Sequence, residues 1–149
     1  MPEPIIQQRH RDFMDGLTRQ VLSDYGITCN IRWYSGNSCN FRVVQNNGHR
    51  EYLITYGETN CASHYAMGFR EYATVRYVWW GMDGRKGNKA LWAIALHECA
   101  HAIQEDRGYL RKGAHHDKRF CDILFELIGK YLYSKVAPPW TLLEDAEFL

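Results

Sequence analysis

Residues 89–106 read KALWAIALHECAHAIQED, and this stretch decides how the rest of the chain is arranged. Apolar residues recur along it at helical spacing, which predicts a helix from about Lys89 to Asp106. Asn88 is placed to cap the first turn, and Gly108 is placed to end the last one. One side of the helix is expected to face the core with Trp92, Leu96, Cys99 and Ile103.

Two histidines and a glutamate interrupt the apolar pattern of this helix. His97 and His101 are four positions apart, so they lie about 40° from each other around the helix axis. Glu98 lies about 60° beyond His101 on the same count. This HExxH arrangement is typical of zinc peptidases, in which two imidazoles hold Zn²⁺ and the glutamate takes a proton from a zinc-bound water. The alternative is a buried histidine pair satisfied by hydrogen bonds.

A catalytic zinc needs a third protein ligand and a coordination position that stays open to water. The downstream candidates are Glu105, His115, His116 and Asp117. Glu105 follows His101 by one turn and lies too far along the helix to bind the same metal ion as both histidines. We therefore expect it to be a surface acid or a residue that contacts a ligand without binding the metal. His116 stands four residues before Phe120, which begins the apolar stripe of a predicted last helix. His115 remains the alternative ligand.

The motif pair HECAH and HHDKRF resembles that of the SprT-like (Spartan-type) zinc metallopeptidases. In that family HExxH is followed by a histidine with a phenylalanine four positions later, a pattern that His116 and Phe120 match. The resemblance implies a zincin-like fold in which His97, His101 and His116 hold Zn²⁺ and Glu98 is the catalytic general base. It also implies hydrolysis of peptide bonds in a protein or peptide substrate by a single domain spanning residues 1–149.

Upstream of the metal helix the sequence predicts a helix followed by a small antiparallel sheet, which makes the fold class α+β. The first helix is expected over residues 5–25. Period-two patterns predict strands in CNIRWYS (29–35), NFRVVQ (40–45), EYLITYG (51–57) and TVRYVWWG (74–81). Asn47-Gly48 predicts a tight hairpin between the second and third strands. Residues 58–71 carry no clear pattern.

Other residues are weaker candidates for the site. Strand 74–80 is a candidate edge to which a substrate peptide adds, with Trp79 and Trp80 as the floor of the groove. Tyr109 is a candidate oxyanion donor, although the sequence favours a core or surface tyrosine at this position. His64 is expected to be a surface or hydrogen-bonded histidine rather than a ligand.

Composition and charge limit the remaining function classes. A net charge of +1 gives no overall reason to expect nucleic-acid binding. Residues 107–119 are locally basic, so an association with DNA remains a minor alternative. Five cysteines without C-x-x-C spacing, no secretory leader and no long apolar run indicate a soluble, cytoplasmic protein without a membrane span. The second alternative is a non-catalytic, zinc-stabilised binding module.

Overall fold

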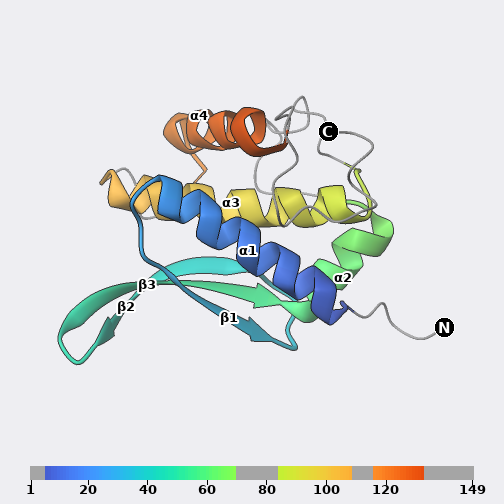
Figure 1. Cartoon of the computed structure of the whole chain (residues 1–149), viewed down its shortest axis with the longest axis horizontal. Helices are drawn as coiled ribbons and strands as arrows, with labels where there is room; N and C mark the ends of the chain where they lie inside the picture. Colours follow the sequence, from blue (N-terminus) through green and yellow to red (C-terminus); the bar gives the residue numbers. More distant parts are fainter. Residues whose placement is uncertain (1–5, 70–83, 109–115, 133–149) are drawn as a thin grey trace.

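The computed structural model describes residues 6–69, 84–108 and 116–132, and within them the chain is an α+β protein (Figure 1). The elements run in the order α1 (Gln8–Asp24), β1 (Asn30–Tyr34), β2 (Asn40–Asn46), β3 (His49–Gly57), α2 (Glu58–Met67), α3 (Asn88–Asp106) and α4 (Lys118–Leu127). A π-helical turn at Ile128–Leu132 continues α4.

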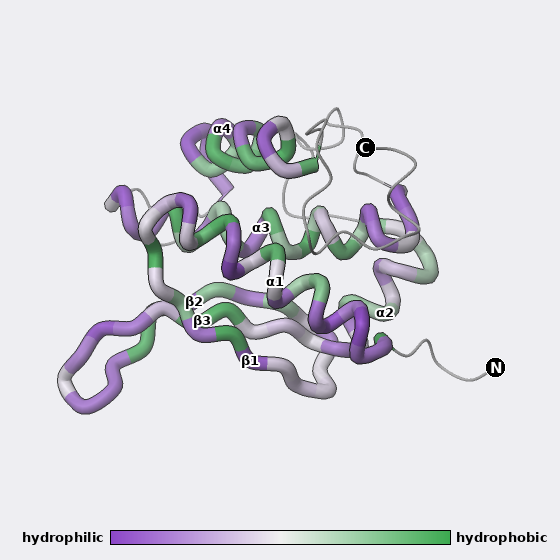
Figure 2. Tube along the Cα trace, viewed as in Figure 1, coloured by the Kyte–Doolittle hydropathy of each residue, from purple (hydrophilic) through white to green (hydrophobic). Residues whose placement is uncertain are grey.

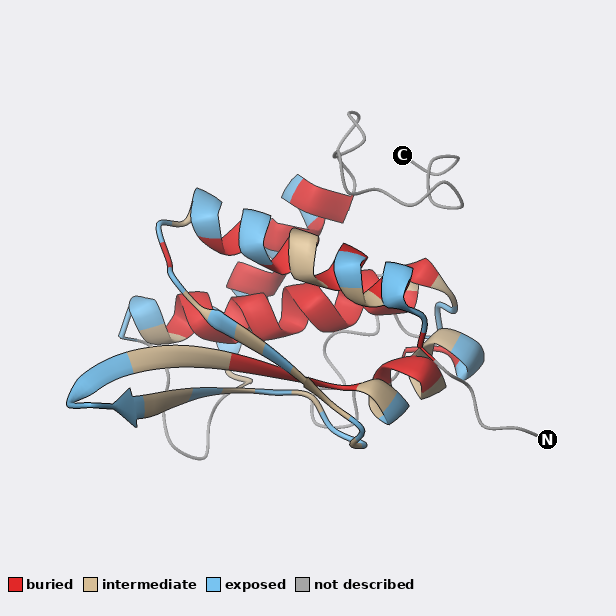
Figure 3. Ribbon diagram, turned by 60° about the horizontal axis from the view of Figure 1, so that its bottom comes forward, coloured by how far each residue is buried: buried red, intermediate tan, exposed pale blue. Residues whose placement is uncertain are grey.

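The elements form three layers. The sheet lies below α1 and α3, and α4 lies on the far side of α3 from the sheet (Figure 1). Helix α3 is therefore in the middle of the molecule, and every residue from Ala90 to Gln104 is buried, as the continuous red ribbon of Figure 3 shows. A helix enclosed in this way can carry polar side chains only where another element satisfies them.

The sheet differs from the antiparallel sheet that the sequence predicts. Strand β3 lies in the middle, antiparallel to β2 but parallel to β1, with Ile31 opposite Ile54. Period-two patterns report which face of a strand is buried and say nothing about its direction, so this part of the prediction is wrong. The predicted fourth strand, residues 74–81, lies outside the described residues.

The predicted hairpin is confirmed. Strands β2 and β3 pair antiparallel up to Asn46 and His49, with only two residues between them. Asn47 has φ of 52° and Gly48 has φ of 80°, the left-handed conformations that a two-residue turn of this kind needs. The tip of the hairpin is hydrophilic and extends beyond the helices (Figure 2).

Helix α1 packs on the inner face of the sheet through specific polar contacts as well as apolar burial. Phe13, Leu17 and Val21 are buried on this helix, and the buried Thr18 bonds to the Tyr56 hydroxyl on β3 at 2.6 Å. The Trp33 indole on β1 donates to Asp15 at 2.8 Å. These two bonds fix the register between α1 and the sheet, because a buried polar group that loses its partner costs about 1–3 kcal/mol.

Two further details depart from the sequence prediction. Residues 58–67 form α2, whose weak apolar periodicity hid it. The residue that caps α3 is Gly87, with φ of 67°, whereas Asn88 is already helical and buried. The Asn88 amide atoms have no hydrogen-bond partner among the residues that the structure describes. The expected capping role of Asn88 is therefore wrong.

No helix in the described part of the chain is long and apolar enough to cross a membrane.

Candidate metal centre

Three histidines from two helices converge between α3 and α4. The Nε2 atoms of His97, His101 and His116 lie 3.2 Å from one another in all three pairs. In the described part of the chain these are the residues whose ligand atoms gather closely enough to hold a metal ion. The structure thus brings together the three histidines that the motif singled out.

Helix α3 supplies two of these side chains. A spacing of four residues places His97 and His101 one above the other, and their rings lie 4.9 Å apart between centroids. Their residues are only 7% and 8% exposed. Small residues surround them on the helix, including Ala100 and Ala102, which let neighbouring elements approach closely.

The N-terminus of α4 supplies the third. Asp117, one of the candidate ligands, instead caps α4, because its side chain accepts a hydrogen bond from the Phe120 backbone N–H at 3.1 Å. His116 directly precedes this cap, so the start of the helix fixes the position of its backbone. The π-helical turn that continues α4 is tied to α1 by the hydroxyl of Tyr131, which donates to Asp24 at 2.6 Å.

Phe120 forms a common packing surface for the three imidazoles. Its ring is fully buried and stacks on His101 with centroids 4.3 Å apart. It also contacts His97 at 4.9 Å and His116 at 5.0 Å in more tilted arrangements. One apolar side chain therefore restricts the rotation of all three candidate ligands.

The cluster is better suited to a cation than to internal hydrogen bonds. A ring nitrogen carries either a proton or a lone pair, so at most two of the three Nε2 contacts can join a donor to an acceptor. Two imidazole nitrogens on one tetrahedral zinc, each 2.0–2.1 Å from it, lie roughly 3.3–3.4 Å apart. The observed separation of 3.2 Å is close to that spacing.

Burial also keeps His97 in the protonation state that binds metal. Loss of hydration lowers the pKa of His97 well below its ordinary value, and the neighbouring His101 and His116 lower it further. A neutral imidazole has a lone pair to offer, whereas an imidazolium has none.

Glu98 is buried beside His97 on α3, with 4% of its surface exposed. Its charge contributes to raising the pKa of the Tyr56 hydroxyl and of the Cys61 thiol, for both of which other causes are larger. The carboxylate therefore lies within electrostatic reach of β3 and α2 as well as of its helix neighbours.

Gln104 is a polar residue of this centre that the sequence analysis overlooked. It is fully buried one turn after His101, and its Oε1 lies 3.1 Å from the His101 Nδ1. Its Nε2 lies 3.5 Å from Asp117 on the neighbouring helix. The spacing of His97, His101 and Gln104, at i, i+4 and i+7, was the available signal for a third polar residue on one face.

The other candidates lie elsewhere. Glu105 forms an ion pair with Arg50 of β3 and is mostly covered, so the expected solvated acid is wrong. Cys99 faces α1, where its sulfur contacts the Thr18 carbonyl. His64 bonds to the Asn60 carbonyl through Nδ1 at 2.9 Å, as expected for a hydrogen-bonded histidine. Four further candidates lie outside the described residues: Trp79, Trp80, Tyr109 and His115.

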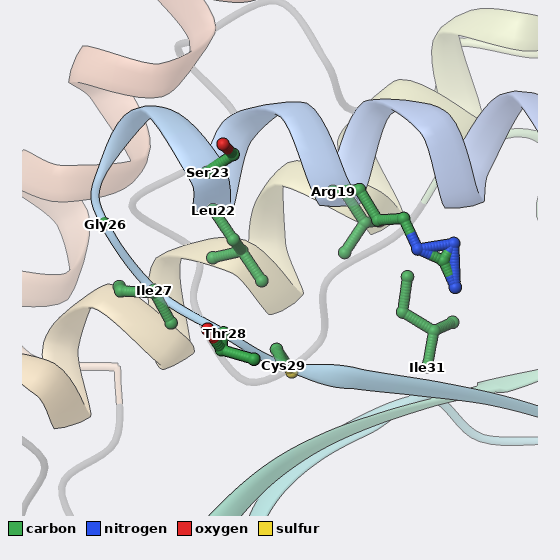
Figure 4. A pocket seen from close by; sticks show the side chains of 9 residues that line it. Arg19, Leu22, Ser23, Gly26, Ile27, Thr28, Cys29 and Ile31 are labelled. Atoms are coloured by element: carbon green, nitrogen blue, oxygen red, sulfur yellow. The ribbon is translucent and has the colours of Figure 1, made fainter.

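A hollow of about 430 Å³ lies apart from the histidines, between the end of α1 and the start of β1 (Figure 4). Arg19, Ser23 and Thr28 are among its polar lining residues, and Leu22, Ile27 and Ile31 are among its apolar ones. None of the three histidines lines it, so it is not the entrance to the metal centre.

Comparison of the chain with protein-family models, with curated proteins and with solved structures gave no match.

Proposed function

We propose that this protein is a zinc-dependent metallopeptidase of the SprT-like, zincin-like type that hydrolyses peptide bonds of a protein substrate. The observation that carries the proposal is the equal 3.2 Å spacing of the three Nε2 atoms of His97, His101 and His116, with Glu98 next to the first of them. Neither the motif nor the spacing alone would suffice, because five-residue patterns arise by chance and histidines also cluster for structural reasons.

The number and type of ligands favour zinc in a catalytic role. Structural zinc sites are closed by four protein ligands, whereas catalytic sites use three and leave one position for water or substrate. The described part of the chain offers three histidines and no fourth ligand within reach. Imidazole nitrogens with tetrahedral spacing suit Zn²⁺ better than Mg²⁺ or Ca²⁺, which prefer oxygen ligands.

When bound, zinc polarises a substrate carbonyl and activates water at neutral pH. Glu98 then acts as the general base that takes the proton of the attacking water and passes it to the leaving amine. Its burial supports this role, because a carboxylate in a poorly hydrated site interacts more strongly with nearby charge. The three histidines serve as ligands of the zinc ion and do not exchange protons in this scheme.

The alternative is a non-catalytic binding module that uses zinc for stability and contacts a partner, including nucleic acid, through its surface. Two residues that would have closed such a site do not contribute to it, because Cys99 faces α1 and Glu105 pairs with Arg50. DNA association remains a prediction from the basic residues 107–119, and a salt-dependent shift in binding would test it.

Metal analysis beside a cleavage assay tests the proposal. We expect about one zinc per chain in the wild type and strong loss of zinc in His97→Ala and His116→Ala. Glu98→Gln should keep its zinc while cleavage of an unfolded protein substrate falls by about 10²–10⁴-fold. Glu105→Gln is the matched control, a carboxylate on the same helix that should retain both.

Each contrary outcome has a distinct meaning. Wild-type cleavage by Glu98→Gln would exclude Glu98 as the general base. Zinc binding by His116→Ala as tight as that of the wild type would exclude His116 as a ligand. Stoichiometric zinc with no hydrolysis by the wild type on any protein substrate would favour the binding module.

A further inference from the structure

We infer that Gln104 is a positioning residue that fixes the tautomer of His101 and couples it to the cap of the helix that follows His116. This inference rests on the proposed metal site. It concerns the geometry of the ligands and adds no group that touches the substrate.

The side chain of Gln104 lies between two parts of the site. It is fully buried, and its amide reaches His101 with the oxygen and Asp117 with the nitrogen. A buried amide that makes polar contacts at both ends has little freedom to rotate, because each alternative would leave a polar atom without its partner.

Asp117 decides which way this amide points. Its carboxylate oxygen accepts from the Phe120 backbone N–H and, being an acceptor, takes a second donor from Gln104 at 3.5 Å. The opposite orientation would place the amide oxygen of Gln104 against the carboxylate oxygen, two acceptors with no proton between them. The amide nitrogen therefore faces Asp117, and the oxygen faces His101.

The orientation of the amide in turn decides the state of His101. An amide oxygen can only accept, so at 3.1 Å the Nδ1 of His101 must carry the proton. A neutral imidazole has a single proton, so the Nε2 keeps its lone pair and faces the other two histidines. Partners that donate or accept at the far nitrogen of a ligating histidine commonly set its tautomer and its ring orientation in this way.

The same contact links the two helices that supply the ligands. Asp117 caps α4 directly after His116, while Gln104 belongs to α3 with His97 and His101. A shift of α4 that moved His116 would stretch the bond between Gln104 and Asp117 and release His101. We therefore expect the loss of Gln104 to weaken metal binding through ring orientation rather than through global unfolding.

Two variants and one control test this inference. Gln104→Met keeps the volume and removes both polar contacts. Asp117→Asn is the conservative variant, because its side-chain oxygen can still accept from both the Phe120 backbone N–H and the Gln104 amide nitrogen. Thr18→Val is the control, because it removes a buried hydrogen bond to Tyr56 in which none of the three histidines takes part.

Two readouts are measured, zinc affinity by chelator competition and the ¹⁵N shifts of the histidine rings in the metal-free proteins. We expect Gln104→Met to bind zinc about 10–100-fold more weakly than the wild type and to lose the single Nδ1-protonated form of His101. Asp117→Asn should keep that form and bind zinc less than about tenfold more weakly than the wild type. Thr18→Val should lower thermal stability with the zinc affinity unchanged.

The outcomes separate this inference from the proposed function. If Gln104→Met binds zinc as tightly as the wild type and keeps the same His101 tautomer, the inference is overturned while the proposed zinc site still stands. An Asp117→Asn variant that binds zinc as poorly as Gln104→Met would also overturn it, since the accepting oxygen is then kept without effect. A wild type that binds no zinc, with the His101 tautomer as described, would instead count against the proposed function.

Discussion

Replacing Phe120 with leucine should weaken zinc binding more than it weakens the fold. Phe120 is fully buried and contacts all three imidazoles, with the closest centroid separation, 4.3 Å, to His101. Leucine fills most of the same space, yet it has no flat ring to restrict the imidazoles. The substitution therefore separates the packing role of this residue from its role in ordering the ligands.

The expected size follows from the ordering of side chains. A swap of similar volume in a core usually costs less than about 1.5 kcal/mol of unfolding free energy. Each ring that Phe120 no longer restrains must be ordered again when zinc binds, at about 0.5–1.5 kcal/mol per side chain. His101 is also held by Gln104, so two rings are freed. The penalty is then about 1–3 kcal/mol, which corresponds to a zinc affinity about 5- to 150-fold weaker.

The assay pairs chelator competition for the zinc dissociation constant with denaturant unfolding of the metal-free protein. Phe13→Leu is the matched control, because Phe13 is equally buried but packs edge-on against Trp92 with centroids 5.5 Å apart, away from the histidines. Both variants should lose similar stability without metal. Only Phe120→Leu should lose zinc affinity, and equal affinities in the two variants would refute the reasoning.

Three further predictions follow from the same structure. Zinc at about a thousand times its dissociation constant should stabilise the fold by about 4 kcal/mol and raise Tm by roughly 8–16 °C, an increase that a chelator reverses and that calorimetry measures. Burial raises the pKa of Asp15 in the folded protein, although the hydrogen bond from Trp33 opposes this rise. The protonated Asp15 carboxyl therefore stabilises the fold below about pH 4, and this stabilisation is lost as the pH rises through the folded pKa. Asp15→Asn should therefore unfold at higher denaturant than the wild type at pH 7 and lose that advantage at acid pH; no gain at pH 7 would contradict this. The hydrogen bond from Cys61, 3.8 Å away, lowers the pKa of Cys39, so Cys61→Ala should shift alkylation of Cys39 to higher pH, and an unchanged pH profile by mass spectrometry would exclude that cause.

The histidine cluster was the most predictable part of the molecule. The spacing of His97 and His101 is a local property of one helix, which helical periodicity carries. The choice of His116 over His115 came from the family resemblance, since His116 precedes the cap of α4 and lies outside its helical repeat. The capping role of Asp117 was predictable from the local sequence, since caps depend on the few residues around them.

Features that depend on distant parts of the chain could not be predicted in this way. The parallel pairing of β1 with β3 depends on how the chain returns across the sheet, which the alternation of Ile31 and Trp33 does not encode. The partner of Glu105 is Arg50, more than fifty residues earlier in the chain. Asn88 has a residue type that favours caps, but the preceding Gly87 takes the capping conformation instead.

X-ray absorption at the zinc edge of the purified, zinc-loaded wild type tests the central claim most directly. The account predicts one zinc per chain with three imidazole nitrogens at about 2.0–2.1 Å and one lighter, exchangeable oxygen ligand. Sulfur scattering at about 2.3 Å, or a shell of four protein ligands, would contradict an open three-histidine centre.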